Sequence, residues 1–180
     1  MHSGRPLGTF GSTSGTTNAS GQFQTTYTVS QFAGQETISA TVDGASGSAT
    51  LNIQLSGLSA LAAGTNYDLQ GAKPVHPSNH FGTATANSHL PPIANQYAAQ
   101  FPGSKLNYND MSLSVGGLFD IGPPKGVLWA TPHDEHRLGK NCDVSKSNVP
   151  SSRWTALTTI FTNNGSPNFL AEADHWHLRF

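Results

Sequence analysis

The first 56 residues alternate between short apolar-polar runs and turns. The runs span residues 22–29, 37–42 and 48–55, and segments rich in Gly, Ser and Thr separate them. Because successive side chains of a β-strand point to opposite faces, a period of two places every second residue on one face. In the third run that face carries Ala49, Leu51, Ile53 and Leu55. These alternations predict half-buried strands, and residues 43–47 predict a turn, so the segment is predicted to be all-β.

Helical spacing appears only in the later part of the chain. Ile93, Tyr97 and Phe101 recur at intervals of four, which predicts a helix over residues 83–101. Pro91-Pro92 lies inside this range. It predicts that the helix begins or breaks there, because proline lacks the backbone N–H of a helical hydrogen bond.

A second helix is predicted from Ser151 or Ser152, since serine is a favourable N-cap residue. The helix ends at Asn163-Asn164-Gly165, and its apolar stripe consists of Trp154, Leu157, Ile160 and Phe161. Short strands are predicted at residues 105–109, 118–121, 169–170 and 175–180. This mixture of elements predicts an α+β fold for the second part of the chain.

The composition changes sharply near residue 56. Arg5, Glu36 and Asp43 are the only charged residues before that point, whereas seven of the eight histidines and all three tryptophans follow residue 74. We therefore interpret residues 1–56 as a first domain, residues 57–74 as a linker and residues 75–180 as a second domain.

The composition of the whole chain excludes several classes of function. The 180 residues carry a net charge of −1 with only nine Lys and Arg, so we expect no nucleic-acid partner. No stretch approaches the roughly 20 apolar residues of a membrane span. The single cysteine, Cys142, excludes an internal disulfide and a zinc site made of cysteines. Oligomeric state stays open.

Part of the first domain resembles a known extracellular module. Residues 16–23, Thr-Thr-Asn-Ala-Ser-Gly-Gln-Phe, and residues 35–42, Gln-Glu-Thr-Ile-Ser-Ala-Thr-Val, resemble the second half of the bacterial immunoglobulin-like repeats of adhesins and invasins. A complete sandwich needs about 100 residues, so the resemblance implies a partial Ig-like sandwich with exposed strand edges and marginal stability. It also implies an extracellular or cell-surface location in a bacterium, with a signal peptide outside this chain.

Two clusters of histidines and carboxylates carry the candidate chemistry. The first runs from His133 through His136 to Asp143, and the second is His175-Trp176-His177. Hydrolytic zinc takes three nitrogen or oxygen ligands and leaves one position for water, and these clusters can supply them. On a strand the two late histidines share one face while Trp176 points to the other. Gly139 argues against one continuous helix, so the first cluster is predicted on a loop that runs into a strand. The alternative is a set of structural histidines with Asp143 as a turn cap.

These motifs resemble the LAS family of zinc peptidases, which includes D-alanyl-D-alanine carboxypeptidases and murein endopeptidases. His136-x-x-Gly139-x-x-x-Asp143 follows the first family motif, and His175-Trp176-His177 follows the second. The resemblance covers residues 75–180. It implies an α+β zinc peptidase-like domain, an antiparallel sheet with flanking helices, in which His136, Asp143 and His177 bind one Zn²⁺. His133 is placed as in the endopeptidase branch, where it would line the pocket.

The catalytic base departs from the family pattern. Where the carboxypeptidase branch has a glutamate, this chain has Asp174, and one of the histidines of the endopeptidase branch corresponds to His175. We favour Asp174, since a carboxylate is the usual proton acceptor beside zinc, and keep His175 as the other candidate. Glu172 is a third choice. Arg179 could orient a substrate carboxylate, or it could be exposed to solvent or structural.

The resemblance implies a zinc-dependent peptidase that acts on peptidoglycan-type or D-amino-acid-containing peptides. The alternative is a non-catalytic cell-surface adhesion or binding module in which the zinc site is structural or vestigial. A fragment that binds no metal is the third possibility.

Overall fold

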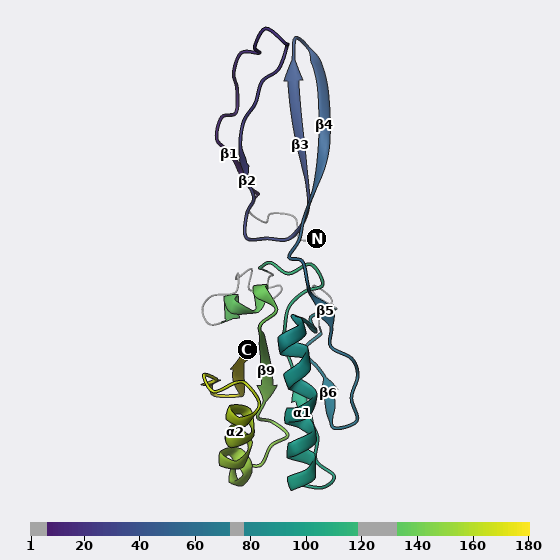
Figure 1. Cartoon of the computed structure of the whole chain (residues 1–180), viewed down its shortest axis with the longest axis vertical. Helices are drawn as coiled ribbons and strands as arrows, with labels where there is room; N and C mark the ends of the chain where they lie inside the picture. The colour runs from purple at the N-terminus through teal and green to yellow at the C-terminus, as the bar shows by residue number, and fades with distance from the viewer. Residues whose placement is uncertain (1–6, 73–77, 119–132) are drawn as a thin grey trace. The chain divides into compact units, whose positions relative to one another are not determined.

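The chain forms two compact units, residues 1–54 and residues 55–180 (Figure 1). The computed structural model describes residues 7–72, 78–118 and 133–180. The division falls two residues before the boundary expected from composition.

The first unit is all-β, as predicted. β1 (Thr9–Phe10) pairs with β2 (Tyr27–Thr28), and β3 (Gly34–Val42) pairs with β4 (Ala45–Ile53), both antiparallel. The β3–β4 hairpin turns at Asp43 and Gly44, whose φ angles of 48° and 82° suit the two-residue hairpin turns that favour Asp-Gly. The turn is therefore shorter than the predicted segment, and the predicted strand over 22–29 is reduced to β2.

Few side chains of the first unit are buried. Among its described residues only Phe32 and Glu36 are buried, and the Tyr27 hydroxyl donates to the Glu36 carboxylate. Of the predicted apolar face of β4, Leu51 and Ile53 are partly buried while Ala49 is exposed. The strands are thus confirmed, and the Ig-like sandwich stays a prediction.

The second unit contains a five-stranded sheet in the order β10-β11-β9-β8-β6. The strands are β6 (Tyr67–Leu69), β8 (Leu106–Tyr108), β9 (Asn141–Ser145), β10 (Leu170–Ala171) and β11 (His175–Arg179). A separate pair joins β5 (Ser59–Ala60) to β7 (Phe81–Gly82). We expected an antiparallel sheet, but the sheet is mixed, because β6 and β8 are parallel. The long helix between these two strands serves as the crossover that a parallel pair requires.

The prediction of a linker over residues 57–74 is wrong, because this segment belongs to the second unit. It supplies β5 and β6, and its side chains Leu61 and Tyr67 are buried in the core of that unit. Strands of two or three residues carry little alternation, and β5 and β6 were not recognised, although the equally short β8 and β10 were.

Helix α1 (Ala84–Gln100) matches the predicted range, but it does not break at Pro91-Pro92. The Thr83 side chain caps it by accepting from the backbone N–H of Ala86. Pro91 is half-buried and Pro92 is exposed, whereas Leu90 and Ile93 on either side of them are fully buried. Burial of the flanking residues holds the helix together, and the carbonyls that the prolines leave free can be satisfied on the more exposed face.

Helix α2 (Trp154–Asn163) follows a short 3₁₀ turn, η2 (Ser151–Arg153). Leu157, Ile160 and Phe161 of the predicted stripe are buried, but its fourth member, Trp154, is exposed. The N-cap is Arg153 and not a serine. Most of the strand predicted over 118–121 lies outside the described residues. Neither helix in the described part of the chain has the length and apolar character to cross a membrane.

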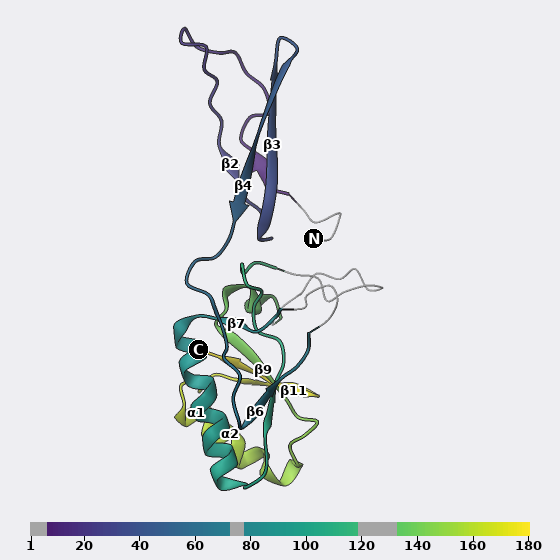
Figure 2. The same cartoon turned by 90° about the vertical axis from the view of Figure 1, so that its right-hand side faces the viewer.

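The two faces of the sheet differ in chemistry. Trp176 and Leu178 of β11 and Cys142 and Val144 of β9 point into one core, together with buried residues of α1 and α2. These helices lie side by side (Figures 1 and 2). The intervening residues of β9 and β11 therefore project from the opposite face, and that face carries the histidines and carboxylates.

Candidate metal centre

His136 reaches the polar face from a 3₁₀ helix, η1 (His133–Leu138), that runs into β9. Gly139 ends this helix with a φ of 67°, a conformation that residues with a Cβ rarely adopt. Its N–H donates to His136 O, and its carbonyl accepts from Thr83 N at the start of α1. The expected loop is thus a helical turn anchored to α1. The side chain of His133 lies outside the described structure, so its pocket role stays a prediction.

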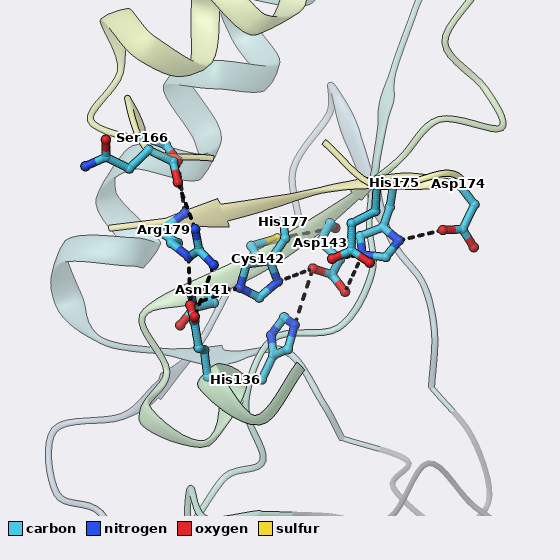
Figure 3. A network of polar contacts seen from close by, with 12 residues as sticks. His136, Asn141, Cys142, Asp143, Ser166, Asp174, His175, His177 and Arg179 are labelled. Atoms are coloured by element: carbon cyan, nitrogen blue, oxygen red, sulfur yellow. Dashed lines mark hydrogen bonds and ion pairs between the residues drawn. The ribbon is translucent and has the colours of Figure 1, made fainter. Parts of the chain in front are cut away.

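Asp143 and His177 are directly opposite each other on β9 and β11. Asp143 Oδ1 lies 2.9 Å from His177 Nδ1 and 3.3 Å from His136 Nε2. The two imidazole rings meet edge to face with centroids 4.7 Å apart. Figure 3 shows both rings directed at the Asp143 carboxylate. The structure therefore brings together the three residues that the motifs singled out.

This trio could hold a metal ion. All three residues are buried, and their ligand atoms lie within 4.8 Å of one another. Ligand atoms bound to a tetrahedral zinc at about 2.0–2.2 Å are about 3.3–3.6 Å apart, so small movements would suffice. Two imidazole nitrogens and a carboxylate oxygen also match the donor set of a hydrolytic zinc site.

The electrostatics of Asp143 suit a cation. Burial by itself would raise the pKa of this carboxyl, but the adjacent imidazoles of His136, His177 and His175 outweigh it and hold the pKa well below its usual range. Asp143 is therefore ionised although it is buried. A buried carboxylate of this kind needs a positive partner.

His175 lies next to the trio, and its neighbours are the other two candidates for the base. Its Nε2 is 3.5 Å from Asp143 Oδ2 and 3.4 Å from Glu172 Oε1. Its Nδ1 is 2.7 Å from Asp174 Oδ1. Burial lowers the pKa of His175, but the carboxylates of Asp143, Asp174 and Glu172 overcome this effect and raise the pKa above its ordinary value.

Asp174, which we favoured as the base, points away from the trio (Figure 3). Its side chain is 88% exposed, and its described partner is His175. The reason is strand parity: β11 begins at His175, so His175 and His177 share a face and Asp174 precedes the strand. The Glu172 side chain is less exposed, at 23%, and its carboxylate contacts His175 Nε2, the ring nitrogen that also faces Asp143. The backbone carbonyl of Glu172 accepts from Lys146.

Arg179 binds a carboxylate of the protein itself. Its Nε and Nη2 donate to Glu135 Oε2 and Oε1 at 2.8 and 3.1 Å. Glu135 Oε2 in turn lies 3.4 Å from His177 Nε2. Asn141 Nδ2 is 3.1 Å from the same ring nitrogen and donates to Glu135 Oε2 at 3.2 Å.

Sequence reasoning missed Glu135 and Asn141. The available signal was parity, because Asn141, Asp143 and their partners Arg179 and His177 alternate along paired strands. For Glu135 the only hint was its position beside His136.

Comparison of the chain with protein-family models finds no match, and comparison with curated proteins finds none either.

Proposed function

We propose that His136, Asp143 and His177 bind one zinc ion and that the chain is a zinc-dependent peptidase. The observation that carries this proposal is the buried trio of two imidazoles and one carboxylate, with ligand atoms within 4.8 Å of one another. A zinc ion held by these three residues would supply a Lewis acid that lowers the pKa of a bound water and polarises the scissile carbonyl.

His175 is the residue best placed to take and return a proton. Its Nε2 faces Asp143 Oδ2 at 3.5 Å, on the edge of the trio. Asp174 accepts from Nδ1 of the same ring at 2.7 Å and so holds the ring in the tautomer whose Nε2 can accept a proton. A carboxylate behind a histidine performs this orienting role in many hydrolases. We therefore assign the base to His175 and an orienting role to Asp174.

The substrate class rests on the motif resemblance. Peptidoglycan-type or D-amino-acid-containing peptides are the substrates that the resemblance implies, and the partial Ig-like segment supports action at or outside a bacterial cell surface. No described helix could span a membrane, so we assign no membrane-embedded role to the helices.

Zinc content tests the metal centre directly. Protein purified without chelator, or supplied with zinc and dialysed, is expected to hold one zinc ion per chain by elemental analysis. His136→Ala and His177→Ala are expected to lose it. His89→Ala is the matched control, because His89 stacks on Phe180 with centroids 5.6 Å apart and contributes nothing to the trio. Wild-type protein that holds no zinc after supplementation would overturn the proposal.

A second function, a non-catalytic binding module with a structural zinc, is favoured by one observation. The carboxylate at the family's base position, Asp174, is 88% exposed and turned away from the trio. Zinc-loaded protein that fails to cleave purified peptidoglycan and D-alanine-containing peptides would support this alternative. Cleavage that stops when zinc is removed and resumes when it is restored would exclude it.

A further inference from the structure

Metal binding by His177 requires a particular tautomer of its ring. The nitrogen that faces Asp143 is Nδ1, at 2.9 Å from Oδ1, so Nδ1 is the nitrogen on the ligand side. A neutral imidazole that offers Nδ1 as a ligand carries its proton on Nε2. That N–H needs an acceptor, because His177 is fully buried.

Within the described part of the chain, a carboxylate oxygen lies beside Nε2. Glu135 Oε2 is 3.4 Å from it, and Asn141 Nδ2 is 3.1 Å from it. With the proton on Nδ1, the ring donates to Asp143 and accepts from the Asn141 amide. With the proton on Nε2, the amide can no longer serve as donor to the ring, and the Glu135 carboxylate is the acceptor. The two tautomers therefore use different neighbours on the same side of the ring.

Arg179 fixes this carboxylate in place. It donates to both oxygens of Glu135, at 2.8 and 3.1 Å, in the two-bond geometry that matches guanidinium to carboxylate. The backbone N–H of Arg179 donates to Ser166 Oγ at 3.0 Å, and Nη1 donates to the carbonyl of Asn168 at 3.3 Å. Glu135 is thus tied to β11, the strand that carries His177.

We propose that Glu135, anchored by Arg179, is a positioning residue of the metal centre: it accepts the Nε2–H of His177 and so directs Nδ1 toward the metal. The inference rests on the proposed zinc site. In this inference Arg179 binds the carboxylate of Glu135 and does not orient a substrate carboxylate. Carboxylates behind metal-binding histidines fix the ring and its tautomer in many metalloproteins, and their loss typically weakens metal binding about 10- to 100-fold.

The test measures zinc affinity by competition with a chromophoric chelator. Glu135→Ala is expected to weaken binding about 10- to 100-fold, and Glu135→Gln, which keeps an oxygen acceptor, is expected to weaken it less. Asp134→Ala is the matched control. Asp134 is on the same 3₁₀ helix and pairs with Arg137 at 3.3 Å, so its loss is expected to leave zinc affinity unchanged.

A double variant distinguishes positioning from general damage. If Arg179 acts through Glu135, Arg179→Met weakens zinc binding, and Glu135→Ala combined with Arg179→Met weakens it no further than Glu135→Ala alone. The Nε2–H resonance of His177 in the zinc-loaded protein gives a second readout, because it shifts when its carboxylate acceptor is lost and does not shift in Asp134→Ala.

The outcomes separate this inference from the proposed function. Wild-type protein without zinc affinity overturns the metal centre and the inference with it. Wild-type affinity in a folded Glu135→Ala variant overturns the inference alone and leaves the metal centre standing. Should Glu135→Ala fail to fold, Glu135→Gln decides: weaker binding than in Asp134→Asn supports the inference, and equal binding overturns it.

Discussion

His175 and Asp174 are neighbours in the chain, but their side chains have different surroundings. The His175 ring is mostly buried, with 12% of its side chain exposed, whereas the Asp174 carboxylate is 88% exposed. A group that moves a proton at the reacting atoms must reach them, directly or through one water. In the proposed site the histidine meets this condition, because its Nε2 lies 3.5 Å from Asp143 Oδ2. The described contact of the aspartate side chain is with the histidine.

His175→Ala is therefore expected to lower turnover of a cleavable peptide about 100- to 10,000-fold, the usual contribution of a general base. Zinc content should stay at the wild-type level, since His175 is not one of the three proposed ligands. Asp174→Ala is expected to cost less, because the ring stays in place and loses only its orienting partner. Turnover and elemental zinc are measured on the same preparations.

The opposite ranking would contradict the assignment. If Asp174→Ala abolishes turnover and His175→Ala keeps most of it, the carboxylate is the base after all. His89→Ala serves again as the control, because it removes an imidazole of the same unit away from the trio.

Single residues show what sequence reasoning could reach in the site. Parity on a strand was enough to place His175 and His177 on one face and Trp176 in the core, and the structure confirms both placements. The contact of Glu135 with His177 could not be predicted, because it depends on how the 3₁₀ helix is placed against β11. That placement follows from tertiary contacts of Gly139, whose carbonyl accepts from Thr83, and not from local spacing.

At the scale of elements, the long periodic segments were predicted well and the short strands only in part. The spacing of Ile93 and Tyr97 predicted α1, and both residues are buried. Strands of two or three residues carry little measurable period: β5 and β6 were missed, whereas the equally short β8 and β10 fall at the strands predicted over 105–109 and 169–170. The parallel pairing of β6 with β8 was also missed, since the direction of a strand depends on the connection that precedes it.

The prolines of α1 show tertiary packing overriding local preference. A proline inside a helix costs about 3 kcal/mol relative to alanine, from a lost hydrogen bond and a steric clash. α1 nevertheless continues through Pro91 and Pro92, with Leu90 and Ile93 fully buried beside them. Leu90 is also fixed through its carbonyl, which accepts from the Tyr108 hydroxyl at 2.5 Å.

Pro92→Ala is consequently expected to stabilise the protein, by about 1–2 kcal/mol. The substitution restores a backbone donor at an exposed position and removes the clash with the preceding turn. The gain is smaller than 3 kcal/mol because alanine also gives the unfolded chain more freedom. The free energy of unfolding from urea titration measures it.

Thr85→Ala is the control for this helix. Thr85 is an exposed residue of α1, and its replacement changes helix propensity by only a few tenths of a kcal/mol. A Pro92→Ala variant no more stable than Thr85→Ala would mean that α1 has adapted its geometry to the proline.

On the scale of the whole molecule, the two units differ in how much they bury. The hydrophobic core cluster runs from Leu61 to Leu178 and lies entirely in residues 55–180. In residues 7–54 the described buried side chains are Phe32 and Glu36, and Leu7, Phe23 and Val42 are well exposed. Apolar burial is the main term that offsets the conformational entropy lost on folding, so the free energy of unfolding should be concentrated in the second unit.

A chain limited to residues 55–180 is therefore expected to fold and to bind zinc with the affinity of the full chain. The trio, His175, Glu135 and Arg179 all belong to this unit, and so do the hydrogen bonds that fix them. Residues 1–54 alone are expected to show little protection of backbone amides from hydrogen exchange, because a two-stranded hairpin is marginally stable by itself. Chelator competition and hydrogen exchange on both fragments measure these properties. The contrary outcome is that the full chain folds and binds zinc while residues 55–180 alone lose zinc affinity or fail to fold. The first unit would then contribute to the stability of the metal centre, and the free energy of unfolding would not be concentrated in the second unit.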